Sequence, residues 1–346
     1  MSTASSRTLI WGGGAIGGVI AAQLLQAGEA VTLVDIVEAH VASIQDNGLE
    51  LVSPEGGSRI FPVQACTPQS LQGQFERIIL CVKGQHTQAA TEMLLPHLHP
   101  DGWVLSMQNG LTEHRVAALA GAERTVGAHV NFAADYLEPG RIQYGGKGSL
   151  VIGAFVPQGA ARAQDAARLL TRAFADTRHT DNIQGYKWSK VCLGSMLFVT
   201  ATNDETMGEQ FANPALQPLW QALASEVLAV AHAAQVEPES FDGFDPSCFA
   251  DPARSDAVRR GLDQIAHHCN TAWVAKPRSG IWRDLYVRRR PTEVDPQITD
   301  IILHAQRLGL AVPIVTRLVD IIRQIERGER ASDPANRLAL MECIAR

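Results

Sequence analysis

Apolar residues in the first half of the chain recur as short runs separated by segments with helical spacing. The apolar runs occupy residues 8–11, 30–34, 77–82 and 103–107. The helix-like segments between them occupy residues 18–28, 37–46 and 87–95. Short apolar runs are typical of strands buried on both faces of a parallel sheet. The alternation therefore predicts an α/β domain with a doubly wound parallel sheet.

Two parts of this half break the alternation. Residues 49–53 and 59–63 are short strand patterns joined by the turn sequence Pro54-Glu55-Gly56-Gly57, so they predict an inserted hairpin. Residues 125–153 alternate short apolar runs with glycine-containing turns, which predicts an antiparallel extension of the sheet. We expect this first domain to span residues 1–182.

Beyond Gly185 the apolar positions follow helical spacing. Helices are predicted at residues 188–199, 216–234, 257–274 and 295–308. Residues 238–252 have the composition of a loop, and the polar tail after Glu326 is expected to fray. We therefore expect an all-helical second domain over residues 183–346, with a binding site in the cleft between the two domains.

A glycine-rich turn follows the first predicted strand. Its residues are Gly12-Gly13-Gly14-Ala15-Ile16-Gly17, a Gly-x-Gly-x-x-Gly pattern that leads into a helix-like segment. Such a turn brings backbone N–H groups and a helix N-terminus against a pyrophosphate. Asp35 ends the next strand 18 residues after Gly17, close to the spacing of about 20 at which an acid accepts hydrogen bonds from a ribose. Because a carboxylate repels a 2′-phosphate, the sequence favours NAD over NADP as cofactor.

Composition and charge exclude several classes of protein. The chain has 346 residues, 46% of them hydrophobic, and a net charge of −6, which offers no basic field for nucleic acid. No apolar run reaches the roughly 18–20 residues of a membrane span, and the first residues lack the layout of a secretory signal. The six cysteines lack metal-ligand spacing, and the adjacent His267-His268-Cys269 point apart on a helix. We expect a cytoplasmic protein without a metal site, a nucleic-acid partner or a membrane partner.

A lysine near the start of the helical domain is the candidate group for proton transfer. Transfer of a hydride to a carbonyl needs a group that supplies a proton to the developing alkoxide. Lys190 precedes a strongly apolar stretch, so its ammonium is expected on a partly buried helix face where burial lowers its pKa. Lysines at such positions are usually solvated, so the assignment needs support from other parts of the chain.

Several motifs in a fixed order supply that support, and together they resemble the ketopantoate reductase (2-dehydropantoate 2-reductase) family. They are the glycine turn, Cys81-Val82-Lys83-Gly84-Gln85, Gln108-Asn109-Gly110, Trp188-Ser189-Lys190, and Trp282-Arg283-Asp284 followed by Pro291-Thr292-Glu293-Val294-Asp295. The resemblance covers nearly the whole chain. It implies a Rossmann domain followed by a helical domain like that of 6-phosphogluconate dehydrogenase, and an NAD(P)-dependent reaction between a 2-oxo acid and a 2-hydroxy acid.

The resemblance also implies roles for individual residues. Lys190 matches the general acid/base lysine, and Glu293 matches a carboxylate that binds substrate and orients that lysine. Asn109 matches an amide near the nicotinamide and the substrate, and Lys83 matches a loop lysine near the cofactor. Glu293 has a second interpretation as a capping acid at a helix N-terminus after Thr292.

The chain departs from the family pattern at positions that contact substrate and cofactor. Gly194 and Phe198 stand four and eight residues after Lys190, where the family usually has asparagines. Gly280, beside Ser279, stands where the family tends to have a serine, and Ile36 replaces a basic residue that typically contacts the 2′-phosphate. Unpaired buried polar groups on a ligand are costly, so these changes predict an NAD-preferring enzyme with a substrate other than ketopantoate.

Several further assignments remain open from the sequence. Arg278, Arg283 and Arg288 are candidates to bind the substrate carboxylate in place of the missing polar residues, since a guanidinium pairs with two oxygens at once. For each of them, a surface position without a ligand is the more common interpretation. His129 and Asn131 follow a predicted strand, and a structural role is the favoured interpretation for the histidine.

Two other functions are kept as alternatives to the NAD-preferring enzyme. One is an ordinary NADPH-dependent 2-dehydropantoate 2-reductase, and the other is a non-catalytic dinucleotide sensor. Because Lys190 and Glu293 are both present, we favour an enzyme over a sensor. The expected partner is a small 2-oxo or 2-hydroxy acid, and the apolar helices predicted at 298–308 and 313–325 are compatible with a homodimer.

Overall fold

The computed structural model describes residues 7–146, 148–251, 255–271 and 277–344. The chain divides into two compact units, Met1–Ile183 and Gln184–Arg346. The strands, all in the first unit, are β1 (Thr8–Trp11), β2 (Val31–Val34), β3 (Leu49–Val52), β4 (Ser58–Phe61), β5 (Gln64–Cys66), β6 (Phe75–Leu80), β7 (Leu98–Ser106), β8 (Thr125–Val130), β9 (Ala134–Glu138), β10 (Arg141–Tyr144), β11 (Leu150–Ala154) and β12 (Arg178–His179). The helices of that unit are α1 (Ala15–Gln26), α2 (Glu38–Asn47), α3 (Thr87–Leu94), α4 (Glu113–Ala120) and α5 (Ala160–Ala173).

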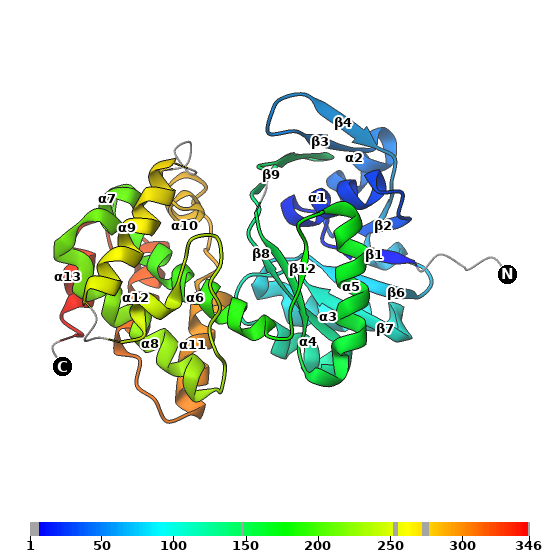
Figure 1. Cartoon of the computed structure of the whole chain (residues 1–346). Helices are drawn as coiled ribbons and strands as arrows, with labels where there is room; N and C mark the ends of the chain where they lie inside the picture. The colour runs from blue at the N-terminus through cyan, green and yellow to red at the C-terminus, as the bar shows by residue number, and fades with distance from the viewer. Residues whose placement is uncertain (1–6, 147, 252–254, 272–276, 345–346) are drawn as a thin grey trace. The chain divides into compact units, whose positions relative to one another are not determined.

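The first unit is built on an eight-stranded sheet in the order β12-β11-β8-β7-β6-β1-β2-β5 (Figure 1). The neighbouring strands β8, β7, β6, β1, β2 and β5 all run parallel to one another. β11 pairs with β8 in antiparallel fashion. Apolar side chains of α1 and α5 pack on one face, and those of α3 and α4 pack on the other. The strand order reverses at β1, so the loops after β1 and β6 flank the switch point at which ligands bind in open α/β sheets. The predicted doubly wound fold is confirmed.

The predicted hairpin β3–β4 becomes part of a second, four-stranded sheet. β3 pairs in parallel with β10, and β10 pairs in antiparallel fashion with β9, so the order is β4-β3-β10-β9. Helix α1 contacts β1 and β2 of the large sheet and β3, β9 and β10 of the small one (Figure 1). A Cβ at Gly18 would lie 2.6 Å from Cγ1 of the buried Ile142, so this glycine permits the close approach of α1 to β10.

The prediction that residues 125–153 extend the large sheet is therefore correct for β11 and wrong for β9 and β10. Both strands contact α1, and the buried Ile142 of β10 packs against Gly18 of that helix. The sequence pattern of a short strand contains no signal for which sheet it joins.

The second unit is helical over its described residues. Its helices are α6 (Ile183–Thr200), which begins at the boundary, α7 (Met207–Ala212), α8 (Gln217–Ala233), α9 (Ser255–Thr271), α10 (Gly280–Trp282), α11 (Asp300–Arg307), α12 (Pro313–Glu326) and α13 (Ala335–Met341). Turns of π-helix at Arg283–Val287 and Asp295–Thr299 extend α10 and precede α11. Residues 272–274 of the helix predicted at 257–274 lie outside the described residues. In the described parts of the chain, no helix combines the length and apolar character needed to span a bilayer.

The C-terminal tail, described up to residue 344, contains helix α13 where fraying was predicted. Arg337 on α13 is 6% exposed and donates two hydrogen bonds to the carboxylate of Glu205, at 2.6 and 2.9 Å. Asn336 donates to the backbone carbonyl of Thr202 at 2.7 Å. The tail looks polar in the sequence because its polar side chains serve as internal hydrogen-bond partners.

Candidate functional site

The glycine turn lies between β1 and α1, at the switch point of the large sheet. Gly12 has a φ of 100°, and a Cβ there would lie 2.9 Å from the backbone nitrogen of Val82. A Cβ at Gly17 would overlap the carbonyl oxygen of Gly12. At Gly14, the N-cap of α1, no described atom lies within 4 Å of the Cβ position. The turn is thus closely packed on its inner side and open at the helix N-terminus, which fits a pyrophosphate.

Asp35 is oriented by backbone N–H groups on both of its carboxylate oxygens. Gly13 N–H donates to Oδ2 at 2.7 Å, and Val37 N–H donates to Oδ1 at 2.9 Å. Because each oxygen has a second lone pair, the carboxylate retains acceptor capacity for a ribose hydroxyl. The next residue, Ile36, has an exposed side chain. Residues 35–38 contain no basic side chain, so the predicted ribose-binding acid has no basic neighbour in this segment.

A buried histidine that the sequence analysis missed connects the glycine turn to the second sheet. His40 is 1% exposed, and its Nδ1 accepts the N–H of Gly140 at 2.9 Å. The proton of the neutral ring therefore sits on Nε2, which donates to the carbonyl oxygen of Gly13 at 2.9 Å. Sequence reasoning had no signal for this role, since Gly140 is 100 residues away along the chain.

The loops after β6 and β7 join the glycine turn at the same sheet edge. Cys81 N–H donates to the carbonyl of Trp11 at 2.8 Å. The buried Gln108 donates from Nε2 to the carbonyl of Val82 and to Oγ1 of Thr87, both at 2.9 Å. This side chain fixes the two loops to each other, and the exposed Asn109 follows it directly.

Two further predicted residues of the first unit have different surroundings, and His129 lies within β8 rather than after a strand. Lys83 is half-buried in the loop after β6. His129 is fully buried and its Nε2 lies 3.0 Å from Oγ of Ser149. The sheet edge thus collects the predicted cofactor residues of the first unit, while His129 has the surroundings of a structural histidine.

Lys190 lies on α6 in the second unit, on the same helix face as Lys187 and Gly194. Its side chain is half-buried. Burial of the ammonium, and then the nearby charge of Lys187, lower the pKa of Lys190 to about 7, against the opposing charges of Asp242 and Glu293. An amine with this pKa both donates and accepts protons near neutral pH.

Lys187 and Asp242 were not predicted as members of this cluster. Lys187 had a usable signal, because it is a second lysine one helical turn before Lys190 in an apolar helix. Asp242 had none, because it belongs to a loop between α8 and α9 whose position depends on the tertiary fold.

Glu293 lies in the turn before the π-helical segment Asp295–Thr299. The backbone N–H and the hydroxyl of Thr292 both donate to Oε1 of Glu326 on α12, each at 2.7 Å. The Thr292 hydroxyl oxygen also accepts the N–H of Val294 at 3.2 Å. The turn that carries Glu293 is therefore anchored to α12, and Gln297 donates to Oε2 of Glu293 at 3.4 Å.

The remaining predicted substrate residues have different environments. Ser279 caps α10, since its hydroxyl oxygen accepts the N–H of Trp282 at 3.2 Å, and Gly280 is exposed. Phe198 is 0% exposed and lies in the core of the second unit. The structure therefore does not place Phe198 at a wall that a ligand can touch, because eight residues turn a helix by about 80° beyond two full turns.

The three arginines considered for the substrate carboxylate differ in their partners. Arg278 donates to the carbonyl of Asp204 at 2.9 and 2.6 Å. Arg288 donates to Oδ1 of Asp284 at 3.0 Å. The Nε of Arg283 is buried and has no hydrogen-bond partner among the described residues. Arg283 thus has an unsatisfied buried donor.

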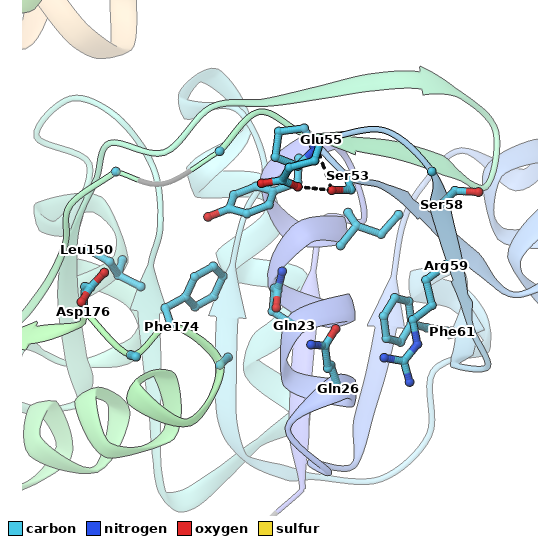
Figure 2. Close-up of a pocket in the computed structure, with 18 of the residues that line it drawn as sticks. Gln23, Gln26, Ser53, Glu55, Ser58, Arg59, Phe61, Leu150, Phe174 and Asp176 are labelled. Carbon is cyan, nitrogen blue, oxygen red and sulfur yellow. Dashed lines mark hydrogen bonds between the residues drawn. The ribbon is translucent and has the colours of Figure 1, made fainter. Parts of the chain in front are cut away.

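The first unit also contains a cavity of about 590 Å³ (Figure 2). Figure 2 shows Gln23 and Gln26 of α1 between Phe174 on one side and Phe61 with Arg59 on the other. Ser53 and Glu55 of the β3–β4 turn, joined by a hydrogen bond, form part of its rim. None of the predicted catalytic or cofactor residues lines this cavity.

Comparisons with known proteins cover both units. Residues 8–157 match the family described as "Ketopantoate reductase PanE/ApbA", and residues 182–326 match its "C terminal" domain. A relative from Halobacterium salinarum named "2-dehydropantoate 2-reductase" is 26% identical over 93% of this chain and 99% of its own length.

Two solved structures resemble the fold of this chain. A PanE/ApbA family ketopantoate reductase from Ralstonia eutropha has a TM-score of 0.75 and 25% identity, covering 93% of this chain and 99% of its own. A D-mandelate dehydrogenase solved with NADH and anilino(oxo)acetate has a TM-score of 0.80 with the same coverage and 20% identity, so that likeness concerns the fold alone.

Proposed function

The chain belongs to the ketopantoate reductase family, and from this premise we propose that it interconverts a 2-oxo acid and a 2-hydroxy acid with NAD. The observation that carries the proposal is the environment of Lys190, whose pKa of about 7 suits proton transfer at neutral pH. A bound nicotinamide dinucleotide supplies or takes up the hydride. The protein must then supply or remove one proton at the substrate oxygen.

Lys190 performs this proton step in the proposed mechanism. In the reductive direction its ammonium gives a proton to the oxygen of the substrate carbonyl, and in the oxidative direction its neutral amine removes the proton of the hydroxyl. The charge of Glu293 favours the ammonium form, and its anchored turn keeps the carboxylate in place. The ammonium and fixed donors also stabilise negative charge that develops on that oxygen.

We assign the binding of the substrate carboxylate to Arg283. Arg278 donates to the backbone carbonyl of Asp204 and Arg288 donates to the carboxylate of Asp284. The buried Nε of Arg283 has no partner among the described residues. A guanidinium that binds a carboxylate satisfies such a donor and neutralises the charge of the acid.

The proposal of NAD as the cofactor rests on the first unit. The open N-terminus of α1 at Gly14 fits the pyrophosphate, and Asn109 and Lys83 follow neighbouring strands at the same edge. The Asp35 carboxylate, oriented by two N–H groups, accepts hydrogen bonds from ribose hydroxyls and repels a 2′-phosphate.

A substitution at Asp35 tests this preference. The variant Asp35→Ala removes the repulsion of a 2′-phosphate, so the ratio of kcat/KM with NADPH to that with NADH should rise at least about tenfold, which corresponds to about 1.4 kcal/mol. Steady-state kinetics with both nucleotides measure the ratio. An unchanged ratio would contradict the role assigned to Asp35.

The second candidate function is an ordinary 2-dehydropantoate 2-reductase, the name carried by the curated relative. We favour a different 2-oxo acid because Gly194 and Gly280 have no side chains with which to hold the polar groups of ketopantoate. Ser279 already serves as the cap of α10.

The deciding experiment follows oxidation of NADH and NADPH by absorbance with ketopantoate and a panel of bulkier 2-oxo acids, for the native protein and Lys190→Ala. Turnover with NADH and an acid other than ketopantoate, lost in the variant, supports the proposal. Efficient NADPH-dependent reduction of ketopantoate assigns the ordinary reductase function. Tight NADH binding without turnover on any acid indicates a nucleotide sensor.

A further inference from the structure

The peptide group between Gly13 and Gly14, in the middle of the glycine turn, is held by two side chains. The N–H of Gly13 donates to Oδ2 of Asp35 at 2.7 Å, and its carbonyl oxygen accepts the Nε2 proton of His40 at 2.9 Å. The same oxygen lies 3.3 Å from the position that a Cβ of Gly18 would occupy on α1. The carbonyl of Gly13 therefore points into the interior of the first unit.

The direction of this carbonyl determines the direction of the next N–H. A trans peptide group is planar, so its C=O and N–H point in opposite directions. The N–H of Gly14 therefore points outward, and among the described residues it has no hydrogen-bond acceptor. No described atom lies within 4 Å of the Cβ position of Gly14 either. Gly14 thus presents a backbone donor at the open N-terminus of α1.

His40 is itself held in place by the second sheet. Its Nδ1 accepts the N–H of Gly140, in the turn between β9 and β10, at 2.9 Å. The ring of Tyr136 on β9 packs against the imidazole, with 5.1 Å between the ring centroids. The His40 side chain is 1% exposed, so its rotamer is fixed by packing on several sides. The small sheet therefore sets the position of the group that orients the Gly13–Gly14 peptide.

We propose that His40 is a positioning residue for the pyrophosphate of the dinucleotide. Its Nε2–H holds the carbonyl of Gly13 inward, so that the N–H of Gly14 is directed at the pyrophosphate before the cofactor binds. Without this hydrogen bond the peptide group would have to be ordered at the expense of binding free energy. This inference rests on the proposed use of a nicotinamide dinucleotide, and it gives the second sheet a part in cofactor binding.

Two substitutions separate the two hydrogen bonds of His40. In His40→Asn the amide oxygen is attached to Cγ, as Nδ1 is, so it keeps the bond from Gly140 and loses the bond to Gly13. In His40→Gln the amide nitrogen reaches the place of Nε2, so it keeps the bond to Gly13 and loses the bond from Gly140. Each variant lacks one hydrogen bond, so urea unfolding should show comparable losses of stability.

The probes are ADP-ribose, which contains the pyrophosphate but no nicotinamide, and adenosine, which lacks the pyrophosphate. Isothermal titration calorimetry measures their Kd values for the native protein and both variants. The Kd for ADP-ribose should rise about 3- to 10-fold in His40→Asn, and His40→Gln should restore most of the lost affinity. The Kd for adenosine should not distinguish the two variants.

The outcomes separate this inference from the proposed function. Equal Kd values for ADP-ribose in the two variants, or an equal loss of affinity for adenosine and ADP-ribose in His40→Asn, overturn the role of His40. Binding of ADP-ribose in the expected order, without turnover of any 2-oxo acid, supports the role of His40 and overturns the proposed reaction. A native protein that binds neither NADH nor ADP-ribose overturns both.

Discussion

Lys190 is suited to acid/base chemistry by its surroundings. Burial and the charge of Lys187 disfavour the ammonium form of Lys190, whereas the charges of Asp242 and Glu293 favour it. The net effect lowers the pKa of Lys190 to about 7. A solvated lysine with a pKa near 10.4 would remain protonated at neutral pH and would be a poor base. A substitution that removes one of these neighbouring charges should therefore change the pKa of Lys190.

The pH dependence should differ between the two directions of the reaction. In the proposed mechanism, reduction of a 2-oxo acid requires the Lys190 ammonium, so its kcat/KM should fall as pH rises through about 7. Oxidation of the 2-hydroxy acid requires the neutral amine, so its kcat/KM should rise over the same range. Initial rates in both directions across this range measure the effect, and profiles of the same sign in both directions would contradict the assignment.

Removal of the Lys187 charge should move this inflection. In Lys187→Met the repulsion between the two ammonium groups is lost, so the pKa of Lys190 should rise and the inflection should move to higher pH. The control Lys187→Arg keeps the charge and should keep the inflection. Asp242→Asn should move it toward lower pH, and a shift in the same direction for Lys187→Met and Asp242→Asn would rule out a charge effect.

At the scale of elements, the glycine turn with its flanking strand and helix is the part best predicted from the sequence. β1, the glycine turn and α1 follow from local periodicity and from glycine requirements within residues 8–26. The sheet to which β10 belongs could not be predicted in this way, since its partners are β3 and the surface of α1, distant along the chain.

In the candidate catalytic site, too, residues in local motifs could be predicted, whereas residues brought in by long-range packing could not. Lys190 and Glu293 were predicted from short motifs, and Lys187 could have been predicted from helical spacing. Asp242 carries no local signal, because its importance arises only when its loop is packed beside α6. Phe198 was predicted as a substrate residue from its alignment with a motif, but the helix turns it into the core.

The turn that carries Glu293 depends on its attachment to α12. Thr292→Val removes the hydroxyl that donates to Glu326 and accepts from Val294, so Glu293 should lose its fixed position and kcat/KM should fall about 3- to 10-fold. Thr316→Val, which removes a hydroxyl bonded to the carbonyl of Val312 within α12, is the matched control. Equal losses of activity in both variants would mean that the effect is one of general stability.

At the scale of the whole molecule, helix α13 attaches the C-terminal end of the chain to the second unit by hydrogen bonds. The match to the family ends at residue 326, yet Arg337 and Asn336 hydrogen-bond to residues that follow α6, the helix of Lys190. The terminal segment is thus hydrogen-bonded to the residues that follow the helix of Lys190.

Loss of the Arg337 guanidinium should destabilise the fold measurably. Arg337→Leu leaves Glu205 without its paired donor, so the free energy of unfolding should fall by about 1.5–3 kcal/mol. Leu338→Ala on the same helix is the control, because its side chain is 61% exposed and should change stability by less than about 0.5 kcal/mol. Urea unfolding of both variants provides the comparison, and equal stabilities would remove the structural role assigned to α13.

The parallel pairing of β3 with β10 has a consequence for the growing chain. Residues 49–52 leave the ribosome about 90 residues before their partners at 141–144, a delay of several seconds at about 5–20 residues per second. During this interval β3 has one edge without a neighbouring strand, and such edges invite pairing with other chains. The nascent protein should therefore be most vulnerable to aggregation after the nucleotide-binding turn has been synthesised and before residue 144 emerges.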